Sequence, residues 1–190
     1  MKKDLGVGPY LFPMPVLMIA TYGENDKVDV MNMAWGGICD TDMVSLNITA
    51  SHKTSKNIKE RKAFTLSIAT VDTMKESDFF GMASGNNMED KFERTGMHAI
   101  KSERVNAPII TEYPVTLECE FVDDREDIYG HRVLGKIVNV IADESVLDEN
   151  GKINPKKLNP IMFDQFQNGY YGIGDKVGQA WNSGKEFMNK

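Results

Sequence analysis

Cysteine is scarce in this 190-residue sequence, which contains only Cys39 and Cys119. The two lie far apart and on different predicted strands, so they form neither a Cys-x-x-Cys redox pair nor a zinc knuckle, and we interpret both as reduced thiols. Histidine is almost as rare. His52, His98 and His131 are isolated, and no HExxH or HxH motif accompanies them. The sequence therefore predicts no metal site.

Motifs of nucleophilic catalysis are also missing. Neither cysteine has a histidine nearby in sequence, and there is no Gly-x-Ser-x-Gly elbow. Gly172, Gly174 and Gly178 look like part of a dinucleotide fingerprint, but their spacing differs from it and no buried strand precedes them. No catalytic residue is predicted.

Long apolar runs and clustered positive charge are absent as well. No segment is long and apolar enough to cross a bilayer, and Pro9, Pro13 and Pro15 interrupt the N-terminal stretch where a signal peptide would need its apolar core. We therefore expect a cytoplasmic protein without a membrane partner. The formal net charge of -6 and the lack of a basic stripe interleaved with aromatics argue against nucleic-acid binding.

What the sequence does contain is enough apolar material for one domain, because 41% of its residues are hydrophobic. We expect this domain to span residues 1–190. Apolar and polar residues alternate in several segments, which is typical of strands with one buried face. The predicted strands are Val16 to Tyr22, Val28 to Met33, Val44 to Ile48, Phe64 to Thr70, Val115 to Val122 and His131 to Ala142.

Turns and a few helices are predicted between and after these strands. Residues Tyr22 to Lys27 and the acidic segment Asp123 to Gly130 are expected to close hairpins. Two short helices are expected between Asp72 and Gly96, the second over Met88 to Thr95, and a last helix over Lys176 to Met188. Antiparallel strands with inserted helices favour a mainly β, Greek-key barrel over a doubly wound sheet.

The segment Asn32 to Gly37 places a wide aromatic, Trp35, beside two glycines that leave the backbone uncovered. Such an arrangement suits the face of a planar ligand. A purely structural interpretation is equally available, in which Trp35 is a core aromatic and Gly36-Gly37 forms a bulge or tight turn between two strands.

The segment Ser51 to Ile58 carries hydroxyls, a lysine and a predicted helix start. Thr54 is a good N-cap for a helix over Ser55 to Lys62, and the unpaired amides of a first helical turn bind anions. Lys53 and the hydroxyl of Ser51 would add donors and positive charge suited to a phosphate. Alternatively, Thr54 merely caps a surface helix. Taken together, the two segments suit a planar phosphorylated ligand.

Several blocks in this order resemble the flavin reductase-like, flavoredoxin-type family of FMN-binding split-barrel proteins. Besides Asn32 with Trp35 and the residues Lys53 to Ile58, the blocks that carry the resemblance are Pro13 to Thr21, Phe64 to Ile68, Ser84-Gly85 followed by Asp90 to Phe92, and Tyr171 to Ala180. The resemblance spans nearly the whole chain and implies a split β-barrel that binds FMN without a covalent bond.

The resemblance also implies site residues and an activity. Residues near the ring, the ribityl chain and the phosphate would be Asn32, Met33, Ala34, Trp35, Asn47, Thr49, Ser51, Lys53, Thr54, Asn57, Ser84, Gly85 and Tyr171. Lys91 belongs to the same region, and we favour a solvated or ion-paired role for it. The implied protein is a homodimer that takes electrons from NADH or NADPH and passes them to a small-molecule or protein acceptor. An FMN-binding module without turnover of its own is the alternative function.

Overall fold

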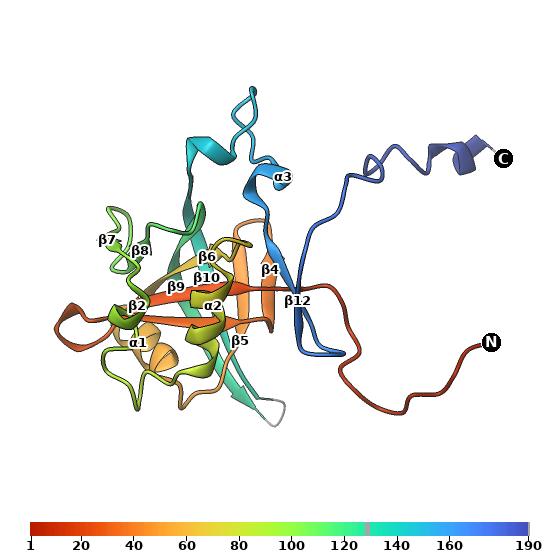
Figure 1. The fold of residues 1–190 in the computed structure, drawn as a ribbon. Helices are drawn as coiled ribbons and strands as arrows, with labels where there is room; N and C mark the ends of the chain where they lie inside the picture. The colour runs from red at the N-terminus through yellow and green to blue at the C-terminus, as the bar shows by residue number, and fades with distance from the viewer. Residues whose placement is uncertain (128–129, 190) are drawn as a thin grey trace.

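The computed structural model describes residues 1–127 and 130–189 (Figure 1). Its main element is a seven-stranded antiparallel sheet with the strand order β3-β2-β6-β9-β10-β5-β4. The strands of this sheet are β2 (Leu17–Tyr22), β3 (Val28–Met33), β4 (Gly36–Asp40), β5 (Met43–Asn47), β6 (Ala63–Ile68), β9 (Val115–Asp127) and β10 (Gly130–Ala142). The prediction of a mainly β, antiparallel split barrel with few helices is confirmed.

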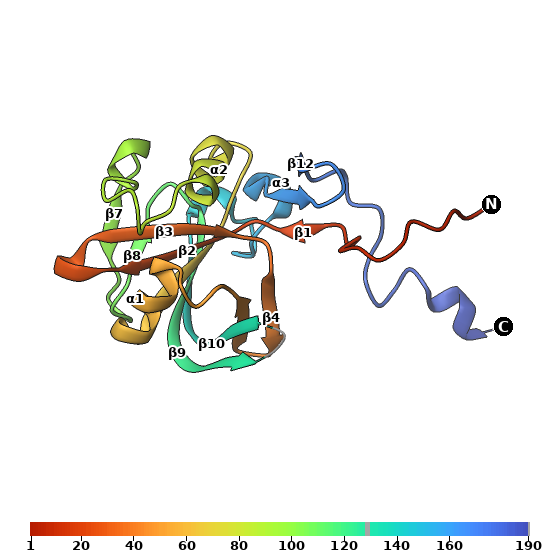
Figure 2. The same ribbon diagram turned by 90° about the horizontal axis from the view of Figure 1, so that it is seen from below.

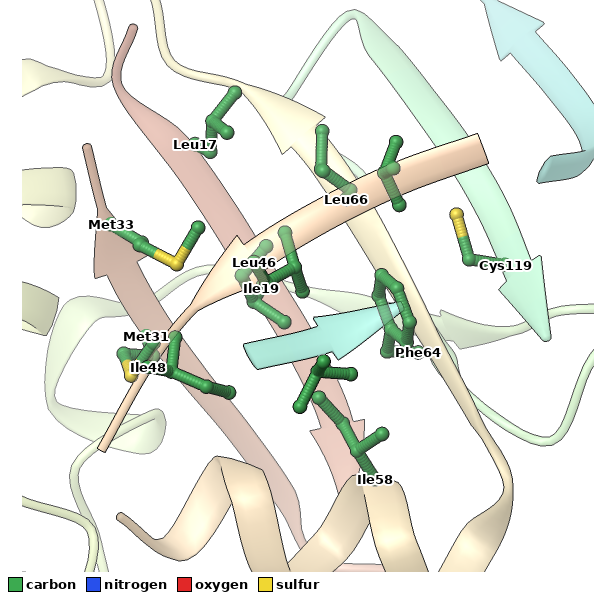
Figure 3. Close-up of a cluster of buried hydrophobic side chains, with 12 residues drawn as sticks. Leu17, Ile19, Met31, Met33, Leu46, Ile48, Ile58, Phe64, Leu66 and Cys119 are labelled. Carbon is green, nitrogen blue, oxygen red and sulfur yellow. The ribbon is translucent and has the colours of Figure 1, made fainter. Parts of the chain in front are cut away.

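The seven-stranded sheet curls around a hydrophobic core that strands far apart in the sequence share (Figure 3). Period-two alternation places Val44 and Leu46 of β5 inside while Ser45 between them stays partly exposed. From the other side of the barrel, Ile19 of β2 and Phe64 of β6 enter the same core. The strands predicted from alternation are therefore correct to within a few residues.

Strand β6 differs from its prediction in one respect, because both of its faces are buried. Thr65 and Ser67, which alternate with the core residues, are also buried. The Thr65 hydroxyl donates to the carbonyl of Pro108 at 2.6 Å, and the hydroxyls of Ser67 and Thr116 lie 2.8 Å apart. Short hydroxyl side chains are suitable here because each finds a hydrogen-bond partner inside the protein.

A second layer covers the other face of strands β2 and β3. It contains a three-stranded sheet, helix α2, and a two-stranded sheet, and its core includes Phe80, Phe92 and Ile161. The small sheets comprise β1 (Met14–Pro15), β11 (Ile161–Asp164) and β12 (Gly169–Gly172), and β7 (Ala99–Lys101) with β8 (Pro108–Ile110). Figure 2 shows the two chain ends running away from this body on the same side as β12.

The α-helices are α1 (Lys53–Arg61), α2 (Met74–Met82) and α3 (Pro155–Leu158). Single-turn 3₁₀ segments lie at Glu24–Asp26 (η1), Glu93–Thr95 (η2) and Glu144–Val146 (η3), and a slightly longer one lies at Lys185–Asn189 (η4). No described helix is long and apolar enough to span a membrane.

Two predicted helices are wrong. Residues 89–92 form turns that lead into η2. Residues 176–179 have no regular structure, and the turns after them lead into η4. The C-terminal segment is exposed along its described length, so no packed face stabilises it, and an unpacked helix of this size is marginal in water. The predicted hairpin over Asp123 to Gly130 is present, but its strands are longer than expected, because β9 continues to Asp127 and β10 begins at Gly130. Residues 128–129 lie outside the described residues.

Stability is expected to decrease at alkaline pH because two groups in the core and one partly buried tyrosine are difficult to ionise. Burial raises the pKa of the Cys119 thiol from 9.0 to about 12, and burial also raises the pKa of Tyr113 and, to about 12, that of Tyr170. Above pH 9 the unfolded chain therefore binds fewer protons than the folded one, and the free energy of unfolding falls as pH rises from about 9 to about 12. Urea denaturation at pH 8 and at pH 11 measures this change. A Tyr113→Phe variant should show a shallower decrease, whereas equal slopes for the two proteins would contradict the assignment.

Candidate functional site

A cavity of about 560 Å³ lies where β3, β5, α1, α2 and the β11–β12 sheet meet. Its walls contain both apolar and charged side chains. The lining residues are Asp29, Met31, Asn32, Met33, Ala34, Trp35, Asn47, Ile48, Thr49, His52, Lys53, Thr54, Asp78, Phe80, Gly81, Met82, Ala83, Ser84, Gly85, Lys91, Phe163 and Tyr170. Ten of the sequence-predicted site residues are among them, and both segments singled out in the sequence reach the cavity.

Asn32 at the end of β3 connects this strand to helix α2. Its amide nitrogen donates to the carbonyl of Ser77 at 2.9 Å and approaches the hydroxyl of Tyr170 at 3.4 Å. Helix and strand approach closely at Gly81, where an added Cβ would lie 3.3 Å from the Cβ of Asn32. The Asn32 side chain therefore fixes the position of the cavity wall.

Trp35 lies at the mouth of the cavity and is half exposed, at 50% of its surface. Gly36 and Gly37 are the first residues of β4, where they pair with Leu46 and Ser45 of β5. The structural alternative of a core aromatic followed by a tight turn is therefore wrong. The Trp35 ring remains available for contact with a ligand in the cavity.

Helix α1 begins at Lys53, two residues earlier than the Ser55 start that a Thr54 cap would give. The N-cap is His52, whose side chain makes no capping hydrogen bond, so the prediction of Thr54 as the cap is wrong. Thr54 is instead buried inside the first turn, where its hydroxyl donates to a carboxylate oxygen of Asp29 at 2.6 Å. No side chain caps the first-turn amides, so their N–H groups remain available as donors at the positive end of the helix dipole.

Two lysines meet next to this helix start, and we call the group formed by Lys53, Lys91, Asp29 and Gly85 the lysine corner. All four residues also line a smaller space beside the main cavity. Lys91 is buried, so the solvated alternative of its predicted solvated or ion-paired role is wrong. Burial lowers the pKa of Lys91, and the nearby charge of Asp29 opposes this shift. With two ammonium groups and one carboxylate, the corner has a positive balance suited to an anion.

Gly85 lets the backbone of the loop after α2 approach the lysine corner closely. A Cβ at this position would collide with the carboxylate of Asp29 and would lie 3.4 Å from the side chain of Lys53. A side chain here would therefore displace the groups of the corner. The sequence-predicted contact at Ser84 and Gly85 thus lies on the cavity wall.

Three predicted site residues lie off the cavity. Ser51 is exposed and its carbonyl accepts a hydrogen bond from Asn86. Asn57 is buried and donates to the hydroxyl of Thr21 at 3.0 Å. Tyr171 packs edge-on against Phe12, with ring centroids 5.9 Å apart.

The adjacent residue, Tyr170, is the cavity-lining tyrosine that sequence reasoning missed. Its hydroxyl donates to Asp78 at 2.9 Å, and burial together with this carboxylate raises the pKa of Tyr170 to about 12. Neighbouring residues of a strand point to opposite faces, so only one of the two tyrosines of β12 can reach the cavity. The sequence alone predicts no strand over Gly169–Gly172. With that strand, the alternation of its side chains would have distinguished Tyr170 from Tyr171.

Comparison with known proteins agrees with this geometry. The flavin reductase like domain model matches residues 10–169. Flavoredoxin of Desulfovibrio vulgaris is 31% identical, with a TM-score of 0.92 and coverage of 97% of this chain and 100% of that one. Flavoredoxin from Methanosarcina acetivorans is 24% identical, with a TM-score of 0.87 and coverage of 98% and 100%.

A more distant structure shares the fold. The FMN-binding protein from Thermus thermophilus is 16% identical, with a TM-score of 0.76 and coverage of 94% of this chain and 99% of that one. The family match and the flavoredoxin similarity support a flavin-binding function in electron transfer. Because the family model covers most of its length, the chain belongs to the family of flavin reductase like domains.

Proposed function

We propose that this protein binds FMN in the main cavity and acts as an NAD(P)H-linked flavin reductase or a flavoredoxin-like electron-transfer protein. The observation that carries the proposal is the combination, in one cavity, of the lysine corner with an aromatic and thioether wall. A single-phosphate ligand with a wide planar ring needs both. The apolar part would bury the ring, and the charged part would bind the phosphate.

Each group has a distinct task in this proposal. Lys53, Lys91 and the first-turn amides of α1 would hold the phosphate. Thr54 would contribute its backbone amide, because its hydroxyl already donates to Asp29. Met33, Ala34 and Trp35 would lie along the ring. Asn47 and Thr49, which line the same cavity, would contact the ribityl chain. Ser84 and Gly85 bring backbone close to the phosphate.

When bound, FMN supplies the redox chemistry, since its ring accepts a hydride or single electrons. The side chains of the cavity then need to bind, orient and shield the cofactor. This division of tasks explains why the lining shows no nucleophile-base pair. Within residues 1–127 and 130–189, moreover, no group of three or more His, Cys, Asp and Glu side chains is placed to hold a metal ion.

One observation favours a second candidate, an FMN-holding module with little turnover of its own. The Tyr170 hydroxyl donates a hydrogen bond to Asp78 at 2.9 Å. Tyr170 is therefore committed to a structural hydrogen bond and does not offer its proton to a substrate. A module that only stores or carries flavin needs no such donor.

The proposal includes a homodimer. Both chain ends extend away from the barrel and expose apolar side chains, among them Val7, Leu11, Val177 and Trp181 (Figure 2). Exposed apolar surface of this kind favours association. A second copy of the chain would cover it.

The experiment that tests the proposed activity is a visible spectrum of the purified protein after FMN is added and the excess is removed. NADH and NADPH are then added anaerobically to separate samples, and ultracentrifugation of the same preparation gives its mass. We expect retained flavin absorbance that bleaches with at least one nucleotide. Retained absorbance that neither nucleotide bleaches would favour the module, and a colourless protein would overturn the proposal.

A further inference from the structure

A second cleft, of about 420 Å³, adjoins the main cavity. The two spaces are bordered by the same four residues, Trp35, Asn47, Ile48 and Thr49. The remaining wall comes from Ala50 and the β9–β10 hairpin, and its hairpin residues are Arg125, Glu126, Gly130, His131 and Arg132. We call this space the arginine cleft.

Two arginines stand directly opposite each other on this hairpin. Arg132 of β10 pairs in register with Arg125 of β9 on one side and with Asn47 of β5 on the other. The three side chains therefore form a row across three strands on one face of the sheet. Like charges directly opposite each other destabilise a sheet, unless an anion lies between them.

The arginines are only partly neutralised by the described residues. The Arg125 guanidinium donates to Asp123 at 3.0 Å. Arg132 is exposed and makes no hydrogen bond or ion pair with any other described side chain. The positive charge of Arg132 is thus available to a ligand.

The other charged groups of the cleft do not offset this row. His131 is buried, and its ring nitrogens lie 2.9 Å from the Ile48 carbonyl and 2.9 Å from Asp124. Glu126 also lines the cleft, but it pairs in register with His131, so its Cβ points to the face of the hairpin opposite the arginines. Among the described side chains, the row of Asn47, Arg132 and Arg125 contains no carboxylate of its own, and Asp123 pairs with Arg125 alone.

We propose that the arginine cleft binds the phosphate groups of the nicotinamide nucleotide that reduces the flavin. This inference rests on the proposed function, because a hydride donor must lie against the ring in the adjoining cavity. Guanidinium groups match phosphate oxygens in a planar, two-pronged geometry. Arg125 and Arg132 would hold the phosphates. The nicotinamide end would then extend past Trp35, which borders both spaces, into the main cavity.

The test uses ligands that bind but cannot transfer hydride. ADP-ribose and 2′-phospho-ADP-ribose are titrated by calorimetry into the FMN-saturated protein, into the variants Arg132→Gln and Arg125→Gln, and into a matched control, Lys136→Gln. Lys136 lies on the same strand and face as Arg132 but outside the cleft, and its contact with Asp42, at 3.9 Å, is exposed. The control therefore removes one positive charge without changing the cleft.

We expect each arginine substitution to weaken binding by about fivefold or more, a value reduced for the exposure of these side chains, and Lys136→Gln to leave it unchanged. If only 2′-phospho-ADP-ribose is affected, the arginines hold the 2′-phosphate; if both ligands are affected, they hold the pyrophosphate. Equal affinity in wild type and arginine variants, or no binding to the wild type, would overturn the inference. The bleaching experiment tests the proposed function separately, because a flavin that bleaches normally can coexist with either calorimetric result.

Discussion

Removing both ammonium groups of the lysine corner, with Lys53→Gln and Lys91→Met, is expected to weaken FMN binding by about 100-fold or more. A charged hydrogen bond contributes about 1.5–3 kcal/mol, and tenfold in affinity corresponds to about 1.4 kcal/mol, so two lost contacts predict an effect of at least this size. Methionine at position 91 keeps a buried side chain of similar length and removes an ammonium group whose pKa is already lowered by burial. Quenching of flavin fluorescence on titration measures the affinity.

Riboflavin separates loss of the phosphate contact from damage to the cavity, because it carries the same ring without the phosphate. The double variant should bind riboflavin as the wild type does, and its preference for FMN over riboflavin should disappear. Lys56→Gln is the matched control, since Lys56 lies on the same helix but is exposed and off the cavity. An equal loss for both flavins would show that the substitutions disturb the ring site instead.

Much of the barrel could be predicted because its strands can be recognised from the local alternation of apolar and polar residues. In β5 the buried residues Val44 and Leu46 alternate with a polar neighbour, and this period of two needs no knowledge of the rest of the fold. The central position of β6 could not be predicted in the same way. Thr65 and Ser67 look like solvent-facing residues until Pro108 and Thr116 supply their buried partners.

Helices without a strong apolar face were predicted less well. The segment over residues 88–95 has acidic residues near its start, as a helix should, but it forms separate turns. Two of its residues are buried for tertiary reasons. Phe92 stacks on Phe80, and Lys91 lines the cavity next to the same ring. Contacts of this kind override local helix propensity, and they also explain why Lys91, which was predicted to be solvated or ion-paired, is buried.

At the site, the sequence indicates the right segments but not the partners of their side chains. Thr54 looks like a helix cap because its hydroxyl could bond locally, whereas the group it contacts is Asp29 on β3. Tyr170 reaches Asn32 and Asp78 from the far end of the chain. Such pairs depend on the fold bringing remote strands together, and no local pattern encodes them.

Phe80→Ala is expected to lower the free energy of unfolding by about 3–5 kcal/mol, which is the usual cost of deleting a fully buried phenyl ring. Phe80 is 1% exposed, stacks on Phe92 with ring centroids 6.3 Å apart, and lies under the Lys91 ammonium, 5.7 Å from its ring centroid. Natural domains have about 5–15 kcal/mol of stability in total, so this single change removes a large share. Urea denaturation of the protein without flavin measures it.

Met82→Ala provides the comparison on the same helix, because Met82 is 79% exposed and its truncation should change stability by less than about 0.5 kcal/mol. Phe80→Leu should recover a substantial part of the loss, since it refills most of the volume next to Phe92. If Phe80→Ala cost no more than Met82→Ala, the stack of Phe80 on Phe92 would not be what holds the 88–95 segment in place. The burial of Lys91 beside the cavity would then need another cause. The expected result instead makes one aromatic ring responsible both for the second core and for the position of the proposed phosphate-binding lysine.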